Sequence, residues 1–523
     1  MKLRFALVIS ALFWTSVAIA DSSSSKHPNV ILFFVDDMGW SDLGVYGSDF
    51  YETPNIDELA ANGVRFTDAY AASHVCSPTR ASLMTGKYPA RLQLTEWLPG
   101  RASRDTDAII TAPKAAALAL DETTIAEAFK ANGYRTAIIG KWHLGENEYG
   151  PTNQGFDLQV PTGARCCPVG GYHPPYRMGG LTIEGREDEY LTDRLTEFAV
   201  NFIGESSEQP YFLYMSHFAV HDPVQGRADL VEKYKQKVAA QPPRPGPAFI
   251  LEGNPDDPEP LTRAQLDALI EEPTYAGQGY LPGRTIRIKQ HQDNAEFAAM
   301  VESVDESLGR ILQALEANNA ADNTIIVFYS DNGGLANGRG KKKGIPNAKY
   351  YSYAAGLRGA TSNLPLRGAK GWLYEGGIRV PLIVHWPGQG KKGLVSDLPV
   401  NSPDFYPTLL EMAGLSPLPD QHVDGVSFAD TVKGKSPLPR SLFWHFPHYS
   451  NHGQQSPGGA IRFGPYKLLE YFENGTTQLF NLQKDPGEQM DLVNQEPETV
   501  KALLGELHAW RERVGAAMPT RRP

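Results

Sequence analysis

Short apolar runs alternate with amphipathic helical patterns over most of the chain. The runs are rich in β-branched and aromatic residues and lie at 29–35, 135–140, 211–216, 324–330 and 380–386. Because nearly every position in them is apolar, they predict strands of a sheet that is covered on both faces. Residues 294–317 repeat apolar positions at steps of three and four, which predicts a long helix. The alternation predicts an open α/β sheet with right-handed crossovers.

Two regions interrupt this alternation. Residues 241–290 are rich in Pro, Gly and charge, which predicts an insertion that lies over the surface. From 415 onward the runs become shorter, and Asn474-Gly475 is typical of a tight hairpin. We therefore predict a large domain over 21–414 with the insertion near 241–290, and a smaller C-terminal α+β subdomain over 415–523 that is closed by a helix near 497–514.

The first twenty residues have the pattern of a signal peptide. Lys2 and Arg4 precede an apolar run, and Ala18-Ile19-Ala20 is a small-residue cleavage site. The run is shorter than a bilayer span, so no membrane anchor is expected. We predict a signal peptide over 1–20 and an exported protein, periplasmic or secreted.

Charge and cysteine content narrow the function classes. The formal net charge is −11 at pH 7, which argues against nucleic acid as a partner but does not exclude a small anionic substrate, because the local charge of a cleft decides binding there. Three cysteines in an exported chain of 523 residues are not a disulfide framework. A bridge between the adjacent Cys166 and Cys167 would be strained, and a bridge to Cys76 would leave one cysteine over.

Cys76 stands just before a predicted helix in "HVCSPTRASLMTG". Pro78 suits the first turn of a helix and Gly86 suits its end. Arg80 follows one helical turn after Cys76, so both side chains can face the same point. A thiol at a helix N-terminus beside a guanidinium should have a lowered pKa and be reactive. The alternative is a small buried apolar residue at a helix cap.

Polar residues follow three of the predicted strands. Asp36 and Asp37 follow 29–35, Asp331 and Asn332 follow 324–330, and Lys141 and His143 follow 135–140. Ligands of an open α/β sheet bind beyond the carboxyl ends of its strands, so these groups are expected to converge. Three carboxylates and an amide offer hard oxygen ligands for Ca²⁺ or Mg²⁺. Each pair alone is also compatible with a helix or turn cap.

Further cationic or proton-carrying groups stand near other strand ends. His217 and His221 follow 211–216, and Lys370 precedes 380–386. Singly, Lys370 is compatible with a solvated lysine and His217 with a core histidine. Together with Arg80, Lys141 and His143, these three residues are predicted to surround a metal ion. Their positive charges would then bind a tetrahedral oxyanion.

Several motifs in a fixed order carry a family resemblance. Cys-x-Pro-x-Arg at 76–80 continues with "ASLMTG", and the chain also contains "DDMGWSDLGVYG", "GKWHLG", "SDNGG" and "YEGGIRVP". Over residues 29–414 these motifs resemble those of the formylglycine-dependent sulfatases, which are the arylsulfatase-like branch of the alkaline phosphatase superfamily. Within that family, the chain resembles the exported polysaccharide sulfatases of bacteria. The resemblance implies a large, mixed but mostly parallel sheet sandwiched by helices, with a smaller C-terminal antiparallel sheet plus helix. It also implies hydrolysis of sulfate esters on a sulfated polysaccharide or oligosaccharide.

The resemblance also implies roles for individual residues. Cys76 would be converted to formylglycine by a separate maturation enzyme. A calcium ion would be held by Asp36, Asp37, Cys76, Asp331 and Asn332. Catalysis would be shared by Cys76, Asp331 as activating base, Arg80 and Lys141 on the sulfate oxygens, His143 at the collapse of the sulfated intermediate, and His221 and Lys370 at the sulfate and leaving alcohol.

Two other functions and one further contact remain open at this stage. The runner-up is a formylglycine-dependent phosphonate monoester or phosphodiester hydrolase, and a silent binder of sulfated glycans would apply if Cys76 stayed a thiol. The basic loop "NGRGKKKG" follows Asp331-Asn332 and predicts substrate contacts at the rim of the site; a solvated loop is the alternative. The candidate substrate residues in this loop are Arg339, Lys341, Lys342 and Lys343, and His217, four residues before His221, is a separate candidate on the substrate side.

Overall fold

The computed structural model describes residues 27–105, 107–161, 167–168, 170–178, 181–205, 209–271, 285–338, 359–450, 452–453 and 455–522. The predicted signal peptide and the basic residues 339–343 lie outside these ranges. Within them, no helix has the length and apolar character needed to cross a membrane.

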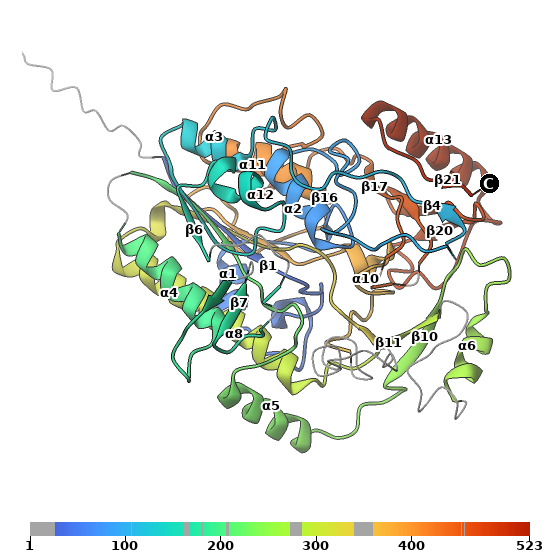
Figure 1. Cartoon of the computed structure of the whole chain (residues 1–523), viewed down its shortest axis with the longest axis horizontal. Helices are drawn as coiled ribbons and strands as arrows, with labels where there is room; N and C mark the ends of the chain where they lie inside the picture. Colours follow the sequence, from blue (N-terminus) through green and yellow to red (C-terminus); the bar gives the residue numbers. More distant parts are fainter. Residues whose placement is uncertain are drawn as a thin grey trace, which may run out of the picture.

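An eight-stranded sheet forms the centre of the molecule (Figure 1). Its order is β15 (Leu394–Ser396), β2 (Val64–Phe66), β14 (Leu382–His385), β12 (Thr324–Ser330), β1 (Asn29–Val35), β9 (Tyr211–Ser216), β5 (Arg135–Gly140) and β6 (Leu158–Val160). All neighbours from β12 to β6 pair in parallel, whereas β14 is antiparallel to both β12 and β2. The mixed, mostly parallel sheet is thus confirmed, with the run at 380–386 shortened to four residues.

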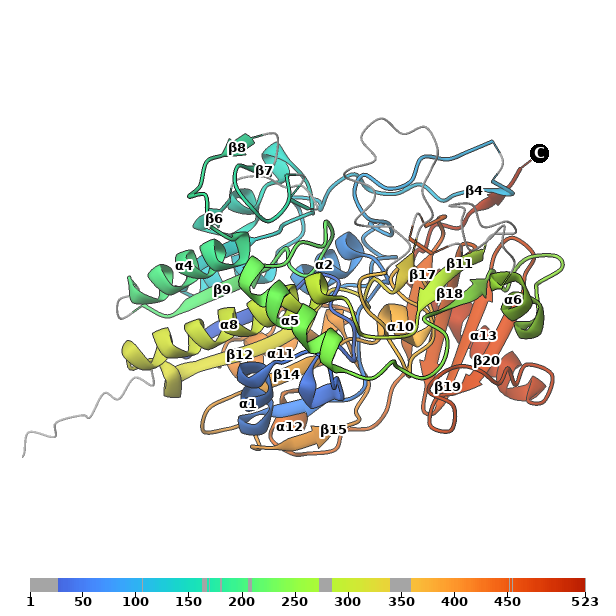
Figure 2. The same ribbon diagram turned by 90° about the horizontal axis from the view of Figure 1, so that it is seen from below.

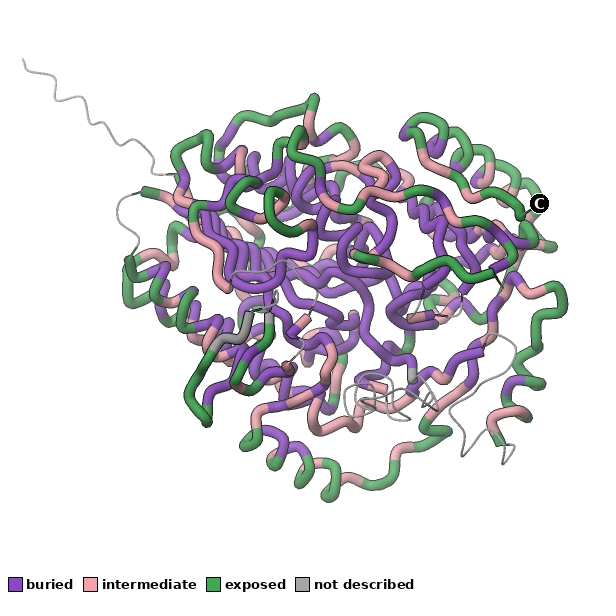
Figure 3. Tube along the Cα trace, in the orientation of Figure 1, coloured by how far each residue is buried: buried purple, intermediate pink, exposed green. Residues whose placement is uncertain are grey.

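Helices cover both faces of this sheet. One face packs against α1 (Pro54–Asn62), α4 (Leu191–Gly204), α5 (Ala228–Ala240) and α8 (Ala295–Ala317). The other face packs against α2 (Cys76–Thr85), α3 (Ile125–Ala131), α11 (Phe405–Met412) and α12 (Ala429–Val432). Alternate residues of β1 enter the two cores, Phe33 one and Phe34 the other, which explains why its sequence is apolar throughout. The buried central strands and the exposed outer helices are visible in Figure 3.

The predicted long helix is α8, and its start has a local cause. The side chain of Asn294 accepts hydrogen bonds from the backbone N–H groups of Glu296 and Phe297, which is the usual N-cap arrangement. The apolar positions seen in the sequence, from Phe297 to Leu315, are buried against the sheet.

The insertion contains regular structure of its own. It includes β10 (Phe249–Gly253), α6 (Arg263–Ile270) and β11 (Thr285–Lys289), and β13 (Asn337–Gly338) completes a three-stranded antiparallel sheet. A capping box of Thr262 and Gln265 starts α6. Ile286 and Ile288 pack with Trp372, so this region is anchored close to Lys370 rather than only lying over the surface.

A second sheet follows near the C-terminus. It consists of β17 (Leu442–Phe446), β18 (Gly458–Phe463), β19 (Tyr466–Tyr471) and β20 (Thr477–Asn481), all antiparallel, and packs against α13 (Pro497–Val514). It stands beside the main sheet in Figure 2. Asn474-Gly475 lies in the predicted hairpin between β19 and β20, with Gly475 at φ 76°. Smaller pairings join β3 (Ala69–Tyr70) to β16 (Val400–Asn401), β4 (Ile109–Ile110) to β21 (Thr520–Arg521), and β7 (Tyr176–Met178) to β8 (Leu181–Ile183).

Buried ion pairs connect the C-terminal sheet to the rest of the fold. Lys467 on β19 lies 2.9 Å from Glu375 on α10 (Glu375–Ile378) and 3.0 Å from Glu488, and all three side chains are fully buried. Asp68 joins Arg379 at 2.9 Å and Arg462 at 2.7 Å. We call this group the structural cluster; its members are Asp68, Glu375, Arg379, Arg462, Lys467 and Glu488.

Candidate active site

Polar side chains from adjacent strands meet at one edge of the main sheet. The neighbours β12, β1, β9 and β5 run parallel, so the residues that follow them lie together, as expected at the carboxyl ends of parallel strands. We call the buried group found there the catalytic cluster; it contains Asp36, Asp37, Cys76, Arg80, Lys141, His143, His221, Asp331, Asn332 and Lys370.

Cys76 is the first residue of α2, with Val75 as the N-cap, so the helix begins one residue earlier than expected. Its Sγ lies 3.5 Å from Asp36 Oδ1 and 3.5 Å from Lys370 Nζ. Burial alone would raise the pKa of this thiol, but Lys141 and Lys370 lower it to about 7. The lowered pKa expected for this thiol is therefore found, although the two lysines rather than Arg80 are the main cause.

The carboxylates pair with the cations, and one carboxylate oxygen and one amide oxygen have no hydrogen-bond partner among the described residues. Asp36 Oδ2 lies 2.5 Å from Lys141 Nζ, and Asp37 Oδ1 lies 2.5 Å from Lys370 Nζ and accepts a hydrogen bond from Asn332 Nδ2 at 2.8 Å. Asp37 Oδ2 and Asn332 Oδ1 are buried and have no hydrogen-bond partner among the described residues. Buried oxygens of this kind require an explanation, and they fit an oxygen-seeking cation such as Ca²⁺.

Arg80 is held in one orientation by several groups. Its Nε and Nη2 donate to Asp331 Oδ2 at 3.0 and 2.9 Å, and Nη1 donates to Ser216 Oγ at 2.7 Å. Burial would raise the pKa of Asp331, but Arg80 and Lys141 hold it well below its usual range. Burial and the charge of Asp331 instead raise the pKa of Asp36. Asp331 therefore remains ionised in this cluster.

The two histidines of the cluster have opposite pKa shifts. Burial, followed by the charge of Lys141, lowers the pKa of His143 well below its ordinary value. For His221, burial and Lys370 act in the same downward direction, but Asp37 and Asp222 outweigh them and raise the pKa well above its ordinary value. His221 Nε2 lies 3.6 Å from Asp37 Oδ2. One histidine is thus neutral and the other protonated, an arrangement suited to separate proton-transfer roles.

His217 is not brought into this cluster. Its Nε2 lies 3.1 Å from Ser307 Oγ on α8, and its ring packs 5.0 Å from that of Phe33. The side chain is fully buried, and burial lowers its pKa to about 3. These contacts are those of the core histidine that the sequence also allowed, not of a substrate contact. Successive side chains at the end of β9 point to opposite faces of the sheet. The side chain of His217 therefore faces α8, whereas that of Ser216 faces Arg80.

Cys76 is a free thiol, and Cys167 is disulfide-bonded. The disulfide therefore leaves Cys76 available. The other candidate substrate residues, Arg339 and Lys341 to Lys343, lie outside the described residues.

Sequence reasoning missed three positions that hold the cluster in place. Ser216 binds Arg80, and its position as the polar last residue of an apolar strand was a usable signal. The carbonyl oxygen of Leu98 lies 2.6 Å from His143 Nε2, and such a backbone contact leaves no signal in the sequence. Gly140 has φ 115°, and a Cβ there would lie 1.7 Å from the Ser216 carbonyl oxygen, so this close approach requires glycine.

Strained backbone also occurs within the cluster. Asp37 and His143 have positive φ angles of 61° and 62°. Residues other than glycine adopt this region at a cost, and such residues concentrate at functional sites.

Comparisons with known proteins agree with this geometry. The family model described as Sulfatase matches residues 28–415, and a second one, N-sulphoglucosamine sulphohydrolase, C-terminal, matches residues 369–513. The chain is 30% identical to a protein named Sulfatase from Formosa agariphila, over 97% of this chain and 92% of that protein. It is 27% identical to human arylsulfatase A, over 94% and 89%.

Solved structures are similar along most of the chain. A crystal structure of Ps i-CgsB in complex with k-i-k-neocarrahexaose superposes with a TM-score of 0.67 at 27% sequence identity, covering 93% of each chain.

Proposed function

The chain belongs to the sulfatase family and is a sulfuric ester hydrolase, and on this premise we propose that it removes sulfate from a sulfated polysaccharide or oligosaccharide, using formylglycine formed from Cys76 and a calcium ion. One observation carries the proposal. The Cys76 thiol lies between a carboxylate and a lysine, beside buried oxygen atoms without hydrogen-bond partners. A reactive position, a cation site and a source of positive charge are thereby combined within one buried cluster.

Formylglycine would supply a hydrated aldehyde with two hydroxyl groups. One hydroxyl would displace the substrate alcohol from sulfur. The other, once deprotonated, would let free sulfate leave as the aldehyde re-forms. A separate maturation enzyme would oxidise Cys76 first. The free state of Cys76 and its place at the start of α2 support this modification.

The chain's own residues would position the ester and move the protons. Arg80, Lys141 and Lys370 are buried cations that would bind the sulfate oxygens, where charge interactions are strong because water is excluded. Asp331, which Arg80 holds ionised, would activate the attacking hydroxyl by accepting its hydrogen bond. His221, whose raised pKa keeps it protonated, would donate a proton to the leaving alcohol. Neutral His143 would accept a proton as the aldehyde re-forms.

The cation would be held by Asp36, Asp37, Asp331, Asn332 and the modified residue 76. When bound, calcium would neutralise the carboxylates and add positive charge next to the sulfate. The unpartnered Asp37 Oδ2 and Asn332 Oδ1 support this ligand set, and oxygen donors of this kind suit calcium better than zinc.

The glycan substrate rests on similarity and on the predicted export. The structural neighbour Ps i-CgsB was solved with a neocarrahexaose, which supports a sulfated galactan or a related glycan here. The proposal includes a signal peptide over 1–20 and export of the protein. It also includes a large domain over 21–414 with its insertion and a C-terminal subdomain over 415–523. Arg339 and Lys341 to Lys343 are proposed to contact the glycan.

A sulfate-release screen tests this function. The matured full-length enzyme is incubated with defined sulfated oligosaccharides, an aryl sulfate, and matched phosphodiester and phosphonate esters. The proposal predicts sulfate release from at least one sulfated sugar at a kcat/KM well above that for any phosphorus ester. Preferred turnover of the phosphonate would favour the runner-up function and overturn this one.

A further inference from the structure

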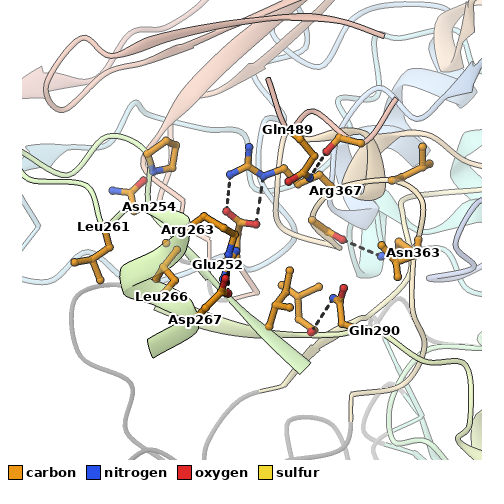
Figure 4. A pocket seen from close by; sticks show the side chains of 18 of the residues that line it. Glu252, Asn254, Leu261, Arg263, Leu266, Asp267, Gln290, Asn363, Arg367 and Gln489 are labelled. Carbon is orange, nitrogen blue, oxygen red and sulfur yellow. Dashed lines mark hydrogen bonds and ion pairs between the residues drawn. The ribbon is translucent and has the colours of Figure 1, made fainter. Parts of the chain in front are cut away.

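A cavity lies between the insertion and the C-terminal sheet, and none of its lining residues belongs to the catalytic cluster. Its volume is about 800 Å³, within the range of pockets that hold small ligands. Three parts of the chain line it: β10, α6 and β11 of the insertion, the segment 363–368, and the segments 476–478 and 487–491 around β20. Figure 4 shows Gln290 and Gln489 on opposite sides of this cavity, with the paired Arg367 and Glu252 between them.

The cavity offers polar atoms with unused hydrogen-bonding capacity. Gln290 Nε2 donates to the Ile288 carbonyl at 3.1 Å and Gln489 Nε2 donates to the Gly487 carbonyl at 2.6 Å. Among the described residues the amide oxygen of each has no donor, so both can accept a hydrogen bond from a ligand. Gln478 uses its amide oxygen for the Tyr374 hydroxyl at 2.8 Å, which leaves its NH₂ group to donate.

Apolar side chains at the rim complement these groups. Leu261 and Leu364 are 36% and 46% exposed, and both line the cavity together with Leu266 and Pro365. A pyranose ring presents hydroxyl groups at its edge and C–H groups on its faces, so it matches a lining of free amides and aliphatic carbons.

The charges of the lining compensate one another. Glu252 pairs with Arg367 at 2.6 Å, and Asp267 pairs with Arg263 at 2.8 Å. Asp491, which accepts the backbone N–H of Leu479, adds a carboxylate without an ion pair among the described residues. Lys289 adds a cation to the lining and pairs with Asp293, outside the lining, at 2.5 Å. The lining thus has three carboxylates and three cations and no excess of positive charge, in contrast to what a sulfate group requires.

We propose that this cavity is a second saccharide-binding site, which takes an uncharged, hydroxyl-rich sugar unit of the glycan. This inference rests on the proposed function, because that function identifies the substrate as a glycan. It divides recognition of the polymer between two places: the catalytic cluster binds the sulfated unit, and the second site binds an unsulfated one.

The wall of the cavity is also continuous with the catalytic cluster. Asn363 accepts a hydrogen bond from Gly334 N at 3.2 Å and donates to the Gly368 carbonyl at 3.2 Å. Gly334 follows Asn332 closely, and Gly368 precedes Lys370 by two residues. A sugar bound in the cavity would therefore contact the segment that carries Lys370, so occupancy should help to place a polymer at the cluster.

Calorimetric titration with a neutral sugar tests the site directly. The probe is neocarrahexaose from which all sulfate has been removed chemically, titrated into the full-length protein. We expect saturable binding with a dissociation constant on the order of 1 mM or below. The double variant Gln290→Ala/Gln489→Ala, which removes one amide from each side, should weaken it about 10-fold or more. The matched control Gln236→Ala, on the exposed surface of α5, should bind as the wild type does.

Turnover separates this inference from the proposed function. The double variant should raise KM for a partly sulfated polymer and leave kcat/KM for a small aryl sulfate unchanged. Absence of binding by the neutral probe at millimolar concentration, or equal binding by wild type and double variant, overturns the second site. Failure to release sulfate from any ester overturns the proposed function instead, whatever the calorimetry shows.

Discussion

The catalytic cluster and the structural cluster have nearly the same charged composition. The first contains Asp36, Asp37, Asp331, Arg80, Lys141 and Lys370, and the second contains Asp68, Glu375, Glu488, Arg379, Arg462 and Lys467. Each therefore joins three carboxylates to three lysine or arginine cations, and these twelve side chains are buried or nearly so. The catalytic cluster also contains protonated His221. Burial and charge alone do not distinguish a site of chemistry from a structural connection.

The difference lies in what the carboxylate oxygens contact. In the structural cluster every carboxylate oxygen lies within 3.0 Å of a cation or a hydrogen-bond donor. Glu375 contacts Lys467 at 2.9 Å and Tyr70 at 2.7 Å, and Asp68 contacts Arg379 at 2.9 Å and Arg462 at 2.7 Å. Glu488 Oε2 accepts the Glu375 N–H at 2.7 Å, and Glu488 Oε1, which makes no hydrogen bond among the described residues, lies 3.0 Å from the Lys467 ammonium. In the catalytic cluster the nearest cation to Asp37 Oδ2 is His221, at the longer distance of 3.6 Å, and Asn332 Oδ1 has no hydrogen-bond partner among the described residues. A thiol also lies among these charges. On the proposed function, spare ligand capacity beside Cys76 is what distinguishes the catalytic cluster from the structural cluster.

The largest expected effect comes from the nucleophile. Cys76→Ser should lower steady-state turnover of an aryl sulfate on the order of 10⁶-fold, as when a catalytic nucleophile is removed, because a serine lacks the second hydroxyl needed to expel sulfate. Its thermal midpoint should stay close to that of wild type, since serine is similar in size to cysteine and can also accept a hydrogen bond from Lys370. Sustained multiple turnovers by this variant would refute the formylglycine mechanism.

The next largest effect should come from removal of the metal ion, to which the two clusters should respond differently. Chelation should abolish aryl sulfate turnover and lower the thermal midpoint, and added Ca²⁺ should restore both; calcium at 100 times its dissociation constant stabilises a protein by about 3 kcal/mol. The calcium-dependent shift in midpoint should vanish in Asp37→Ala and persist in Glu488→Gln. Scanning calorimetry at several calcium concentrations measures it. An equal shift in both variants would place the ion elsewhere.

Breaking the structural cluster should affect stability rather than chemistry. Lys467→Met leaves Glu375 and Glu488 buried without their cation, so the free energy of unfolding should fall by about 3–5 kcal/mol. The folded fraction should keep nearly the wild-type kcat. Lys435→Met is the matched control, because Lys435 is 65% exposed and its pair with Asp430 should contribute only about 0–1 kcal/mol. A selective loss of kcat with unchanged stability would show that the cluster takes part in catalysis.

The smallest effect is a pH dependence of stability. Burial and the charge of Glu375 raise the pKa of Glu488 from 4.5 to about 7. The folded state then holds this proton more tightly than the unfolded chain, so the stabilisation is complete below the unfolded pKa and is lost as pH rises through the folded one. Glu488→Gln lacks this titration. Its thermal midpoint relative to wild type should therefore rise between about pH 4.5 and 7; a flat or falling difference would contradict the shift.

Sequence patterns predicted the strands that carry the site because those strands are apolar throughout and end in polar residues. Asp36, Asp37, Asp331 and Asn332 are such residues, and parallel pairing brings them together. Local patterns also predicted α8 and α13, whose periodicity and caps lie within the segment itself.

Other features depend on contacts that local sequence does not contain. The insertion was predicted without its strands, because short β10 and β11 stand among Pro- and Gly-rich residues and pair across a long separation. Glu375 and Arg379 lie in the quoted "YEGGIRVP" motif, yet their partners Lys467 and Asp68 come from distant strands. His217 and His221 follow the same strand, and only the packing of α8 shows that His217 belongs to the core.

The central claim is that Cys76 becomes formylglycine and that activity depends on it. Peptide mass analysis of an active, full-length preparation measures this directly, with an aldehyde-reactive hydrazide as a second readout. The account predicts that the peptide containing Cys76 has lost the mass difference between a thiol side chain and an aldehyde, and that the modified fraction is proportional to specific activity across preparations. Full specific activity in protein whose Cys76 is an unmodified thiol would contradict the account.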